Sequence, residues 1–260
     1  MLRIAAIQHD IVWEQPVENF AAITPMIDMA VDEGAGMVVL AEMWSTGFSM
    51  NSVEIAERPD GPTAAFMHET AARTGAWVVG SFPEHTDGYD RPTNRLLMAG
   101  PNGEDHRYAK IHPFTYAGED AHYAAGRDRL TVEIDGVRIT PLICYDLRFA
   151  DLFWDPAPTT DCYLVPANWP AVRREHWTTL LRARAIENQA YVVGVNRVGS
   201  AGRLDYTGDT RIIDPLGAVT EAPASEIATI FGDIDPAEVA RVRAEFPFMQ
   251  DRVTQDRGNT

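Results

Sequence analysis

Ten short runs of apolar residues recur along the chain, with turn-forming residues between them. Their length and their content of Val, Ile, Leu and aromatic residues are typical of β-strands. Several runs, such as 38–40 and 191–193, are continuous and do not alternate with polar residues, so we expect strands that are covered on both faces. The predicted strands span residues 4–8, 37–43, 77–82, 95–99, 130–134, 137–144, 162–167, 191–197, 210–213 and 229–234.

Helical periodicity occupies the intervals between several of these runs. In the first helix, apolar residues follow the i, i+3, i+4 rule, although Pro25 should kink the helix or mark a restart. Gly75 is a suitable C-terminal cap for the second helix, and Pro236 suits the first turn of the fourth. The four predicted helices span residues 20–31, 63–74, 173–189 and 236–243.

The order of these elements indicates the fold class. Strands first alternate with helices and later pair directly through turn signals such as Asn102-Gly103 and Asp135-Gly136, which favours a layered α/β sandwich over one open sheet. No repeat or linker divides the chain, so we expect residues 1–260 to form a single domain. The tail at about 249–260 is polar, and we expect it to be loosely held or to reach another subunit.

Charge narrows the range of partners. The sequence has 22 basic and 38 acidic residues, a net charge of −16, and this field repels phosphate backbones and anionic membrane surfaces. We therefore expect neither nucleic acid nor a membrane as a partner. No apolar stretch is long enough for a membrane helix, and the first residues lack a signal-peptide layout, so a cytoplasmic protein is predicted. The two cysteines are then expected to be reduced.

One of these cysteines stands at a strand end. Cys144 closes the run 137–144 and precedes polar residues, and α/β folds place their sites at the carboxyl ends of strands. The free N–H groups of a following helix would favour a thiolate and could bind an oxyanion. On position alone, however, an inert core cysteine is the commoner situation, and Cys162 fits that description better.

Two further side chains leave predicted strands. Lys110 is the single lysine among the 22 basic residues, which is either an accident of composition or a position that needs a compact ammonium. Glu42 ends the run 37–43, where a buried carboxylate must be paired or act as an acid or base; a glutamate that reaches solvent is the simpler alternative. Together with Cys144, these residues could supply a nucleophile, a base and an oxyanion stabiliser.

The three positions lie in motifs that resemble those of the nitrilase superfamily of carbon–nitrogen hydrolases. Residues 40–42 match the family's first motif, 108–112 the second and 143–149 the third, in the family's order. Glu119 matches a second functional glutamate, and the resemblance extends over nearly the whole chain. It implies a four-layer α-β-β-α sandwich, catalysis without a cofactor, and a homodimer. Ala41, where many members have proline, departs from the pattern without touching a catalytic side chain.

Residues downstream of the third motif resemble the ω-amidase branch of this superfamily, whose members hydrolyse the terminal amide of 2-oxoglutaramate and 2-oxosuccinamate. The resemblance implies a small-molecule amide as substrate. An N-carbamoyl amide hydrolase or an aliphatic amidase is the alternative within the superfamily. A non-catalytic protein-binding scaffold is the alternative from another class, although such a module has no need of the three reactive residues. The matching segments are 167–170, 173, 176–177, 183–191 and 196–199.

The resemblance also assigns roles to the matched residues. Glu42 would take the thiol proton of Cys144, and Lys110 with the backbone N–H of Tyr145 would bind the oxyanion. Lys110 and the helix start were expected to favour the thiolate form of Cys144. Glu119 would orient Lys110 or the incoming amide, unless it is an ordinary surface carboxylate.

Phe48, Asn168, Trp169 and Arg173 are the candidates for substrate binding. Phe48 and Trp169 could wall the acyl pocket, beside Asn168, although aromatic residues near strand ends more often belong to the core. A carboxylate on the substrate needs a local cation in so acidic a protein, and Arg173 with Arg174 could form a fork for it. A solvated first helical turn explains these two arginines equally well.

Other kinds of site have less support in the sequence. A pair of Cys144 with His112 or His176 would make a papain-like dyad, but no signature of that class occurs. The seven histidines are scattered, and neither a zinc motif nor a phosphate-binding glycine loop is present. We therefore expect no metal site.

Overall fold

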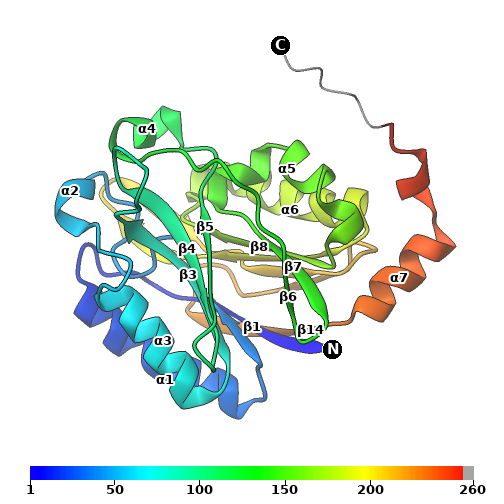
Figure 1. Ribbon diagram of the computed structural model, residues 1–260, viewed down its shortest axis with the longest axis horizontal. Coiled ribbons are helices and arrows are strands. Elements are labelled where there is room, and N and C mark those ends of the chain that lie inside the picture. The colour runs from blue at the N-terminus through cyan, green and yellow to red at the C-terminus, as the bar shows by residue number, and fades with distance from the viewer. Residues whose placement is uncertain (254–260) are drawn as a thin grey trace.

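The computed structural model describes residues 1–253 and contains two six-stranded sheets stacked face to face, with helices on their outer faces (Figure 1). The strand order is β14-β1-β2-β3-β4-β5 in one sheet and β13-β12-β9-β8-β7-β6 in the other. A short hairpin, β10-β11, stands apart from both. The four-layer sandwich predicted from the motifs is confirmed.

The first sheet shows how residue alternation builds two cores. Ile4 and Ala6 of β1 belong to the core between the sheets, whereas Ala5 and Ile7 belong to the core beneath helices α1 and α3. This period of two is what a strand covered on both faces requires. The elements of this half are β1 (Leu2–Gln8), β2 (Met37–Val39), β3 (Trp77–Glu84), β4 (Thr93–Ala99), β5 (Asp105–Ala109), β14 (Ala228–Ile234), α1 (Pro16–Asp32) and α3 (Pro62–Thr74).

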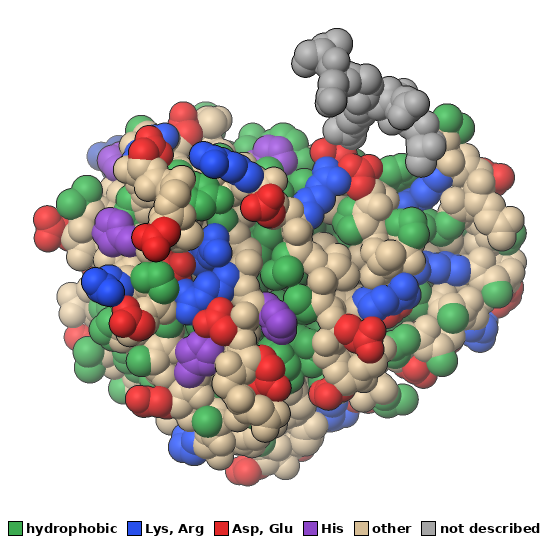
Figure 2. All heavy atoms as spheres, in the orientation of Figure 1, with side chains coloured by type: hydrophobic (Ala, Val, Ile, Leu, Met, Phe, Trp, Pro, Cys, Tyr) green, Lys and Arg blue, Asp and Glu red, His purple; other side chains and the backbone are tan. Residues whose placement is uncertain are grey.

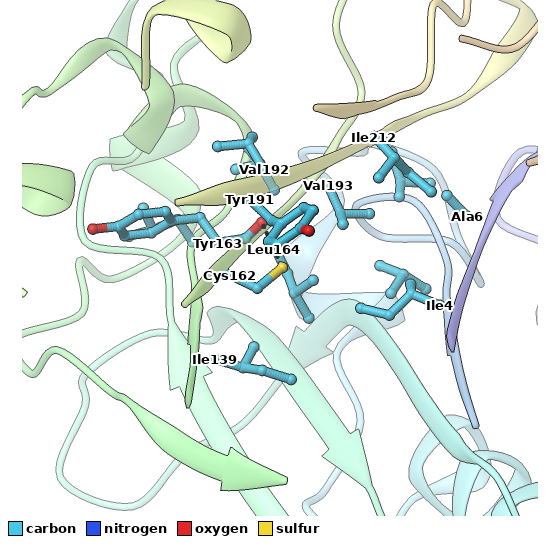
Figure 3. Close-up of a cluster of buried hydrophobic side chains, with 14 of the residues drawn as sticks. Ile4, Ala6, Ile139, Cys162, Tyr163, Leu164, Tyr191, Val192, Val193 and Ile212 are labelled. Atoms are coloured by element: carbon cyan, nitrogen blue, oxygen red, sulfur yellow. Dashed lines mark hydrogen bonds between the residues drawn. The ribbon is translucent and has the colours of Figure 1, made fainter. Parts of the chain in front are cut away.

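The second sheet is covered by α5 and α6. Trp177 and Leu181 of α6 lie against Gly194 of β9, where an added Cβ would stand 2.4 Å from a Leu181 methyl, so only glycine allows this close approach. Figure 3 shows the side chains between the sheets, among them Ile139 and Cys162. The elements of this half are β6 (Val132–Ile134), β7 (Val137–Pro141), β8 (Cys162–Ala167), β9 (Tyr191–Asn196), β12 (Arg211–Ile213), β13 (Val219–Glu221), α5 (Asp151–Trp154) and α6 (Arg174–Asn188).

Short elements connect the strands and helices of the two halves. They are α2 (Ser52–Ile55), α4 (Glu119–His122), α7 (Pro236–Glu245), β10 (Val198–Ala201), β11 (Leu204–Thr207) and the 3-10 turns η1 (Thr115–Ala117), η2 (Cys144–Arg148), η3 (Ala157–Thr159), η4 (Ala171–Arg173) and η5 (Phe248–Asp251).

Several predicted strands are shorter in the structure than their apolar runs. The run 37–43 yields only β2, because the chain turns after Val39 and Met43 adopts a left-handed φ of 43°. The run 137–144 yields β7 and then η2, so Cys144 begins a 3-10 turn. In both places the turn residues are themselves buried, and their hydrophobicity extends the apparent strand. Helix α1 continues through Pro25 without the predicted restart.

The first part of the polar tail is anchored. The guanidinium of Arg252 donates to the carbonyl oxygens of Trp154 at 2.9 Å and Glu187 at 2.7 Å. Of the tail predicted at about 249–260, Arg252 is therefore held against the rest of the protein, and residues 254–260 lie outside the described part of the chain. Within residues 1–253, no helix combines the length and apolar character that crossing a membrane requires. Acidic, basic and histidine side chains are interspersed over the face in Figure 2.

Candidate active site

Two carboxylates share one ammonium at the end of the first sheet. Glu42 follows β2, Lys110 follows β5 directly, and Glu119 begins α4. Lys110 Nζ donates to Glu42 Oε1 at 2.8 Å and to Glu119 Oε1 and Oε2 at 3.1 and 2.8 Å. None of the three is more than 1% exposed. The strand ends thus converge as the sequence led us to expect, and the only lysine forms the centre of this buried charge cluster.

Cys144 approaches the cluster from the second sheet. It follows β7 and adopts a left-handed φ of 44°, which is uncommon for a residue with a side chain and concentrates at functional sites. Its thiol lies within interaction range of the Glu42 carboxylate and the Lys110 ammonium. A nucleophile, a carboxylate and a cation therefore meet between the two sheets.

Asp146 holds the turn that presents Cys144. Its Oδ2 accepts the backbone N–H of Ile143 at 3.1 Å and the hydroxyl of Tyr108 at 2.8 Å. Its Oδ1 accepts the backbone N–H of His112 at 2.9 Å, and the His112 ring nitrogen Nδ1 lies 3.0 Å away. This one buried carboxylate joins η2 to the segment that carries Lys110, which explains why the residues around Cys144 and Lys110 form two linked motifs.

The electrostatics of the site differ from the expectation in one respect. Burial and the charge of Glu42 raise the pKa of the Cys144 thiol well above its ordinary value, and Lys110 opposes this only in part. Lys110 thus favours the thiolate as expected, but burial and Glu42 outweigh it, and the raised pKa favours the protonated thiol. Although burial disfavours its charge, Glu119 and Glu42 raise the pKa of Lys110. Burial raises the pKa of Glu119, with Lys110 acting in the opposite direction.

The two oxygens of Glu42 are differently engaged. Oε1 accepts hydrogen bonds from Lys110 Nζ and from Asn94 Nδ2, both at 2.8 Å. Oε2 accepts the backbone N–H of Asn168 at 2.8 Å, and the Asn168 amide also donates to the Glu42 carbonyl oxygen. Since a carboxylate oxygen has two lone pairs, Oε2 keeps one for a further proton. Asn168, a predicted substrate contact, thus also orients Glu42.

A pocket of about 460 Å³ opens onto the Cys144 thiol. Most of its wall is aromatic or aliphatic, and its polar groups come from Arg148, Arg173 and Asn168. The predicted substrate-binding residues all line it, as does Tyr145, whose backbone N–H was the expected second oxyanion donor. The lining residues are Phe48, Phe114, Ala117, Cys144, Tyr145, Arg148, Asn168, Trp169, Pro170, Arg173, Leu204 and Tyr206.

Two arginines of this pocket are held by aromatic rings. The guanidinium carbon of Arg148 lies 4.8 Å from the centre of the Trp169 ring, and that of Arg173 lies 5.2 Å from the Phe114 ring centre. Within the described part of the chain, neither makes an ion pair with a carboxylate. Arg174, by contrast, pairs with Asp209 at 2.7 Å. The expected Arg173–Arg174 fork is therefore wrong for Arg174, and Arg148 is the second pocket cation.

The histidines do not form a dyad with Cys144. The His112 ring contacts Asp146 and stacks on Phe149, while His176 Nδ1 lies 3.1 Å from a guanidinium nitrogen of Arg148. Nor do residues 1–253 contain a group of three or more His, Cys, Asp or Glu side chains arranged to hold a metal ion.

Sequence comparison decides the family. The sequence model of the carbon-nitrogen hydrolase family matches residues 3–244. The chain belongs to the carbon–nitrogen hydrolases. The family predicted from the three motifs is therefore confirmed, and the chain is an amidohydrolase.

Curated relatives of this hydrolase include amidases. It is 38% identical to the omega-amidase YafV of Yersinia enterocolitica, with 96% of each chain covered. It is 32% identical to the 2-oxoglutaramate amidase of Bacillus subtilis, covering 95% of this chain and 96% of that protein. A crystal structure of a carbon–nitrogen hydrolase superfamily protein from Xanthomonas campestris superposes with a TM-score of 0.92 at 39% identity, over 99% of both chains. That structure carries an arsenic adduct in its active site.

Sequence reasoning gave no role to three residues of the hydrolase site. Arg148 and Asp146 lie in the third motif, but only the fold places one in the pocket and the other beneath Cys144. Asn94 is the second residue of β4, and its polar side chain comes just before the predicted strand 95–99. That polarity is the single signal that could have drawn attention to it.

Proposed function

We propose that the hydrolase cleaves the terminal amide of small 2-oxo acid amides, such as 2-oxoglutaramate and 2-oxosuccinamate, through a thioester on Cys144. The observation that carries this proposal is the pocket itself. At one end the thiol faces a carboxylate and an ammonium, and along the wall Arg148 and Arg173 have no carboxylate partner among the described residues. A substrate with an amide at one end and an acid at the other matches that arrangement.

The pocket supports an anionic substrate on physical grounds. The chain has a net charge of −16, so an anion needs local cations to enter. A guanidinium binds a carboxylate through two parallel hydrogen bonds, and the aromatic rings beneath Arg148 and Arg173 limit their freedom before substrate arrives. The omega-amidase and 2-oxoglutaramate amidase names of the relatives agree with this substrate class.

The first half of the reaction forms the thioester. The Cys144 sulfur attacks the amide carbon as its proton passes to Glu42 Oε2, the oxygen with a free lone pair, and the carbonyl electron pair moves onto oxygen. The Lys110 ammonium and the backbone N–H of Tyr145 stabilise that oxyanion. When the intermediate collapses, the C–N bond breaks, Glu42 returns the proton to the departing nitrogen, and ammonia leaves. A neutral resting thiol suits this concerted transfer.

The second half releases the acid. A water molecule takes the place of ammonia and gives a proton to Glu42 as its oxygen attacks the thioester carbon. The second oxyanion occupies the same donors, the C–S bond breaks, and the thiolate recovers its proton from Glu42. Glu119 binds Lys110 with both oxygens and accepts the backbone N–H of Phe114 at 2.5 Å, so it fixes the ammonium relative to the pocket wall.

A panel of amides tests the substrate class. We expect kcat/KM for 2-oxoglutaramate to exceed that for an aliphatic amide of equal length without the carboxylate by about 100-fold, as two charge-assisted contacts allow.

Arg148→Met should raise KM for 2-oxoglutaramate by about 10-fold or more and leave KM for the aliphatic amide unchanged. Arg174→Met, whose guanidinium pairs with Asp209, is the matched control. Faster turnover of ureido or simple amides would contradict this substrate class.

We also propose that the hydrolase is a cytoplasmic homodimer, as the family resemblance implies. Light scattering on the purified full chain measures the oligomeric state, and a monomer at all concentrations would contradict the dimer.

A further inference from the structure

A third polar side chain is buried between the two glutamates. Asn94 is 1% exposed and lies near the start of β4, opposite Pro83 of β3. Its Nδ2 donates to Glu42 Oε1 at 2.8 Å and to Glu119 Oε1 at 3.3 Å. Its carbonyl oxygen accepts the backbone N–H of Lys110 at 3.0 Å. Side chain and backbone of this one residue thus contact all three members of the charge cluster.

The other end of the Asn94 amide has no partner. Its Oδ1 is buried and makes no hydrogen bond to any described residue. A buried carbonyl oxygen without a hydrogen-bond partner disfavours folding. The Oδ1 atom therefore gives no reason for the presence of an asparagine at position 94. Asn94 is also absent from the pocket wall, which excludes a substrate contact in this structure. What remains is the donor end and the two carboxylates that it joins.

We propose that Asn94 is a positioning residue for amide hydrolysis. By donating one N–H to each glutamate, it keeps Glu42 Oε1 turned toward Lys110 and leaves Oε2 as the oxygen that receives the Cys144 proton. This inference rests on the proposed roles of Glu42 and Cys144 in the mechanism above.

An amide is suited to this position for reasons of charge and geometry. Two carboxylates and one ammonium already share the cavity, and an aspartate would add a third anion. A second lysine or arginine would compete with Lys110 for the same oxygens. The NH₂ group of asparagine supplies two hydrogens in one plane, adds no charge, and cannot lose its proton.

The test measures kcat, KM and the pH profile of Asn94→Leu and Asn94→Asp with the amide that the wild type hydrolyses best. We expect Asn94→Leu to lower kcat by about 10- to 100-fold, since hydrogen bonds to charged groups have effects of that size, and to change KM less than about 3-fold. The pH profile of kcat should also differ from that of the wild type, because the Glu42 carboxylate loses one of its hydrogen-bond donors. The ionisable groups that face Glu42 in this cavity are Lys110, Glu119, Cys144, Tyr123 and Tyr206.

Asn94→Asp keeps the shape and replaces the donor by an acceptor. It should be less active than Asn94→Leu at neutral pH and should recover relative to it as the pH falls, because a protonated carboxyl can donate again. Asn188→Leu is the matched control: Asn188 is equally buried, and its Nδ2 donates to the Arg184 carbonyl oxygen, remote from Glu42. This variant should keep the wild-type pH profile whatever its thermal stability.

The outcomes separate a positioning role from a structural one. If both Asn94 variants keep kcat within about 3-fold, or lose it equally at every pH, the inference is wrong. If Asn94→Leu does not fold, the isosteric Asn94→Asp decides alone. Glu42→Gln distinguishes the two proposals. If Glu42→Gln is inactive and the Asn94 variants are active, only the positioning role of Asn94 is overturned. If Glu42→Gln is active, both the general-base role of Glu42 and the positioning role of Asn94 are overturned. If the wild-type hydrolase prefers another amide, the proposed substrate class changes, but the test of Asn94 still applies.

Discussion

The two cysteines of the hydrolase lie near each other along one sheet, Cys162 in β8 and Cys144 in the turn that follows the neighbouring strand β7, and they have opposite surroundings. Both are buried, and burial is the main cause that raises the pKa of each thiol. Cys162 begins β8, opposite Ile139 in the core between the sheets, and Asp161 raises its pKa further (Figure 3). Cys144 follows β7, at the end of the sheet where Lys110 and Glu42 arrive. Burial therefore does not distinguish a reactive cysteine; its charged neighbours and its pocket do.

The backbone geometry also differs between the two cysteines. Cys162 has ordinary strand geometry, whereas Cys144 adopts a left-handed φ of 44° that places its side chain at the pocket. Such geometry persists only where the surrounding structure enforces it, and here Asp146 ties the turn to the Lys110 segment. The strained cysteine is the one that we propose as the nucleophile, and the relaxed cysteine is part of the core.

Removing each sulfur gives the largest expected contrast. Cys144→Ala should lower kcat by about 10⁴-fold or more, since the covalent route is lost, while Cys162→Ala should keep kcat within about 3-fold. Steady-state ammonia release by both purified variants measures the difference, with circular dichroism to establish the fold. Comparable activity in the two variants would remove the basis for a Cys144 nucleophile.

The cation beside Cys144 gives the next largest effect. Lys110→Arg keeps the charge but replaces a compact ammonium by a planar guanidinium, which cannot occupy the same point between Glu42 and Glu119. We expect kcat to fall by about 100- to 1,000-fold, the size of effect seen when an oxyanion donor is displaced. Single-turnover measurements at saturating amide would show this as a slower acylation step. A variant with near wild-type kcat would mean that charge alone suffices.

Backbone strain gives the smallest effect, and it should have opposite signs at the two cysteines. Cys144→Gly should be more stable than Cys144→Ala by about 1 kcal/mol, because glycine adopts positive φ without cost. Cys162→Gly should be less stable than Cys162→Ala by about 1 kcal/mol, because glycine weakens a strand. Urea unfolding of the four variants measures both differences. A Cys144→Gly variant that is less stable than Cys144→Ala would show that Cys144 is not strained.

The order of the elements was enough to predict a layered α/β sandwich, and predicted strand ends made Glu42, Lys110 and Cys144 candidates. Only the resemblance to the family motifs joined these three into one site, added Glu119 and implied the four layers. Strand ends were less predictable, because buried turn residues such as Leu40 and Met43 are as apolar as the strand they follow.

The remaining features depend on contacts that no local pattern encodes. Asn94 comes beside Glu42 only through the register of β3 with β4, and Arg173 and Arg174, adjacent in sequence, face a pocket and an aspartate respectively. The state of the Cys144 thiol is a balance between burial, one anion and one cation, and its direction required the packed site.

The central claim is that the Cys144 sulfur becomes acylated, and intact-protein mass spectrometry during turnover tests it most directly. Rapid acid quenching of the hydrolase with excess 2-oxoglutaramate should trap a protein whose mass increases by the substrate acyl group. Peptide mapping should place that increase on Cys144, with Cys162 unmodified. A hydrolase that turns over at full rate with no adduct at any time, or with the adduct on another residue, would contradict the account.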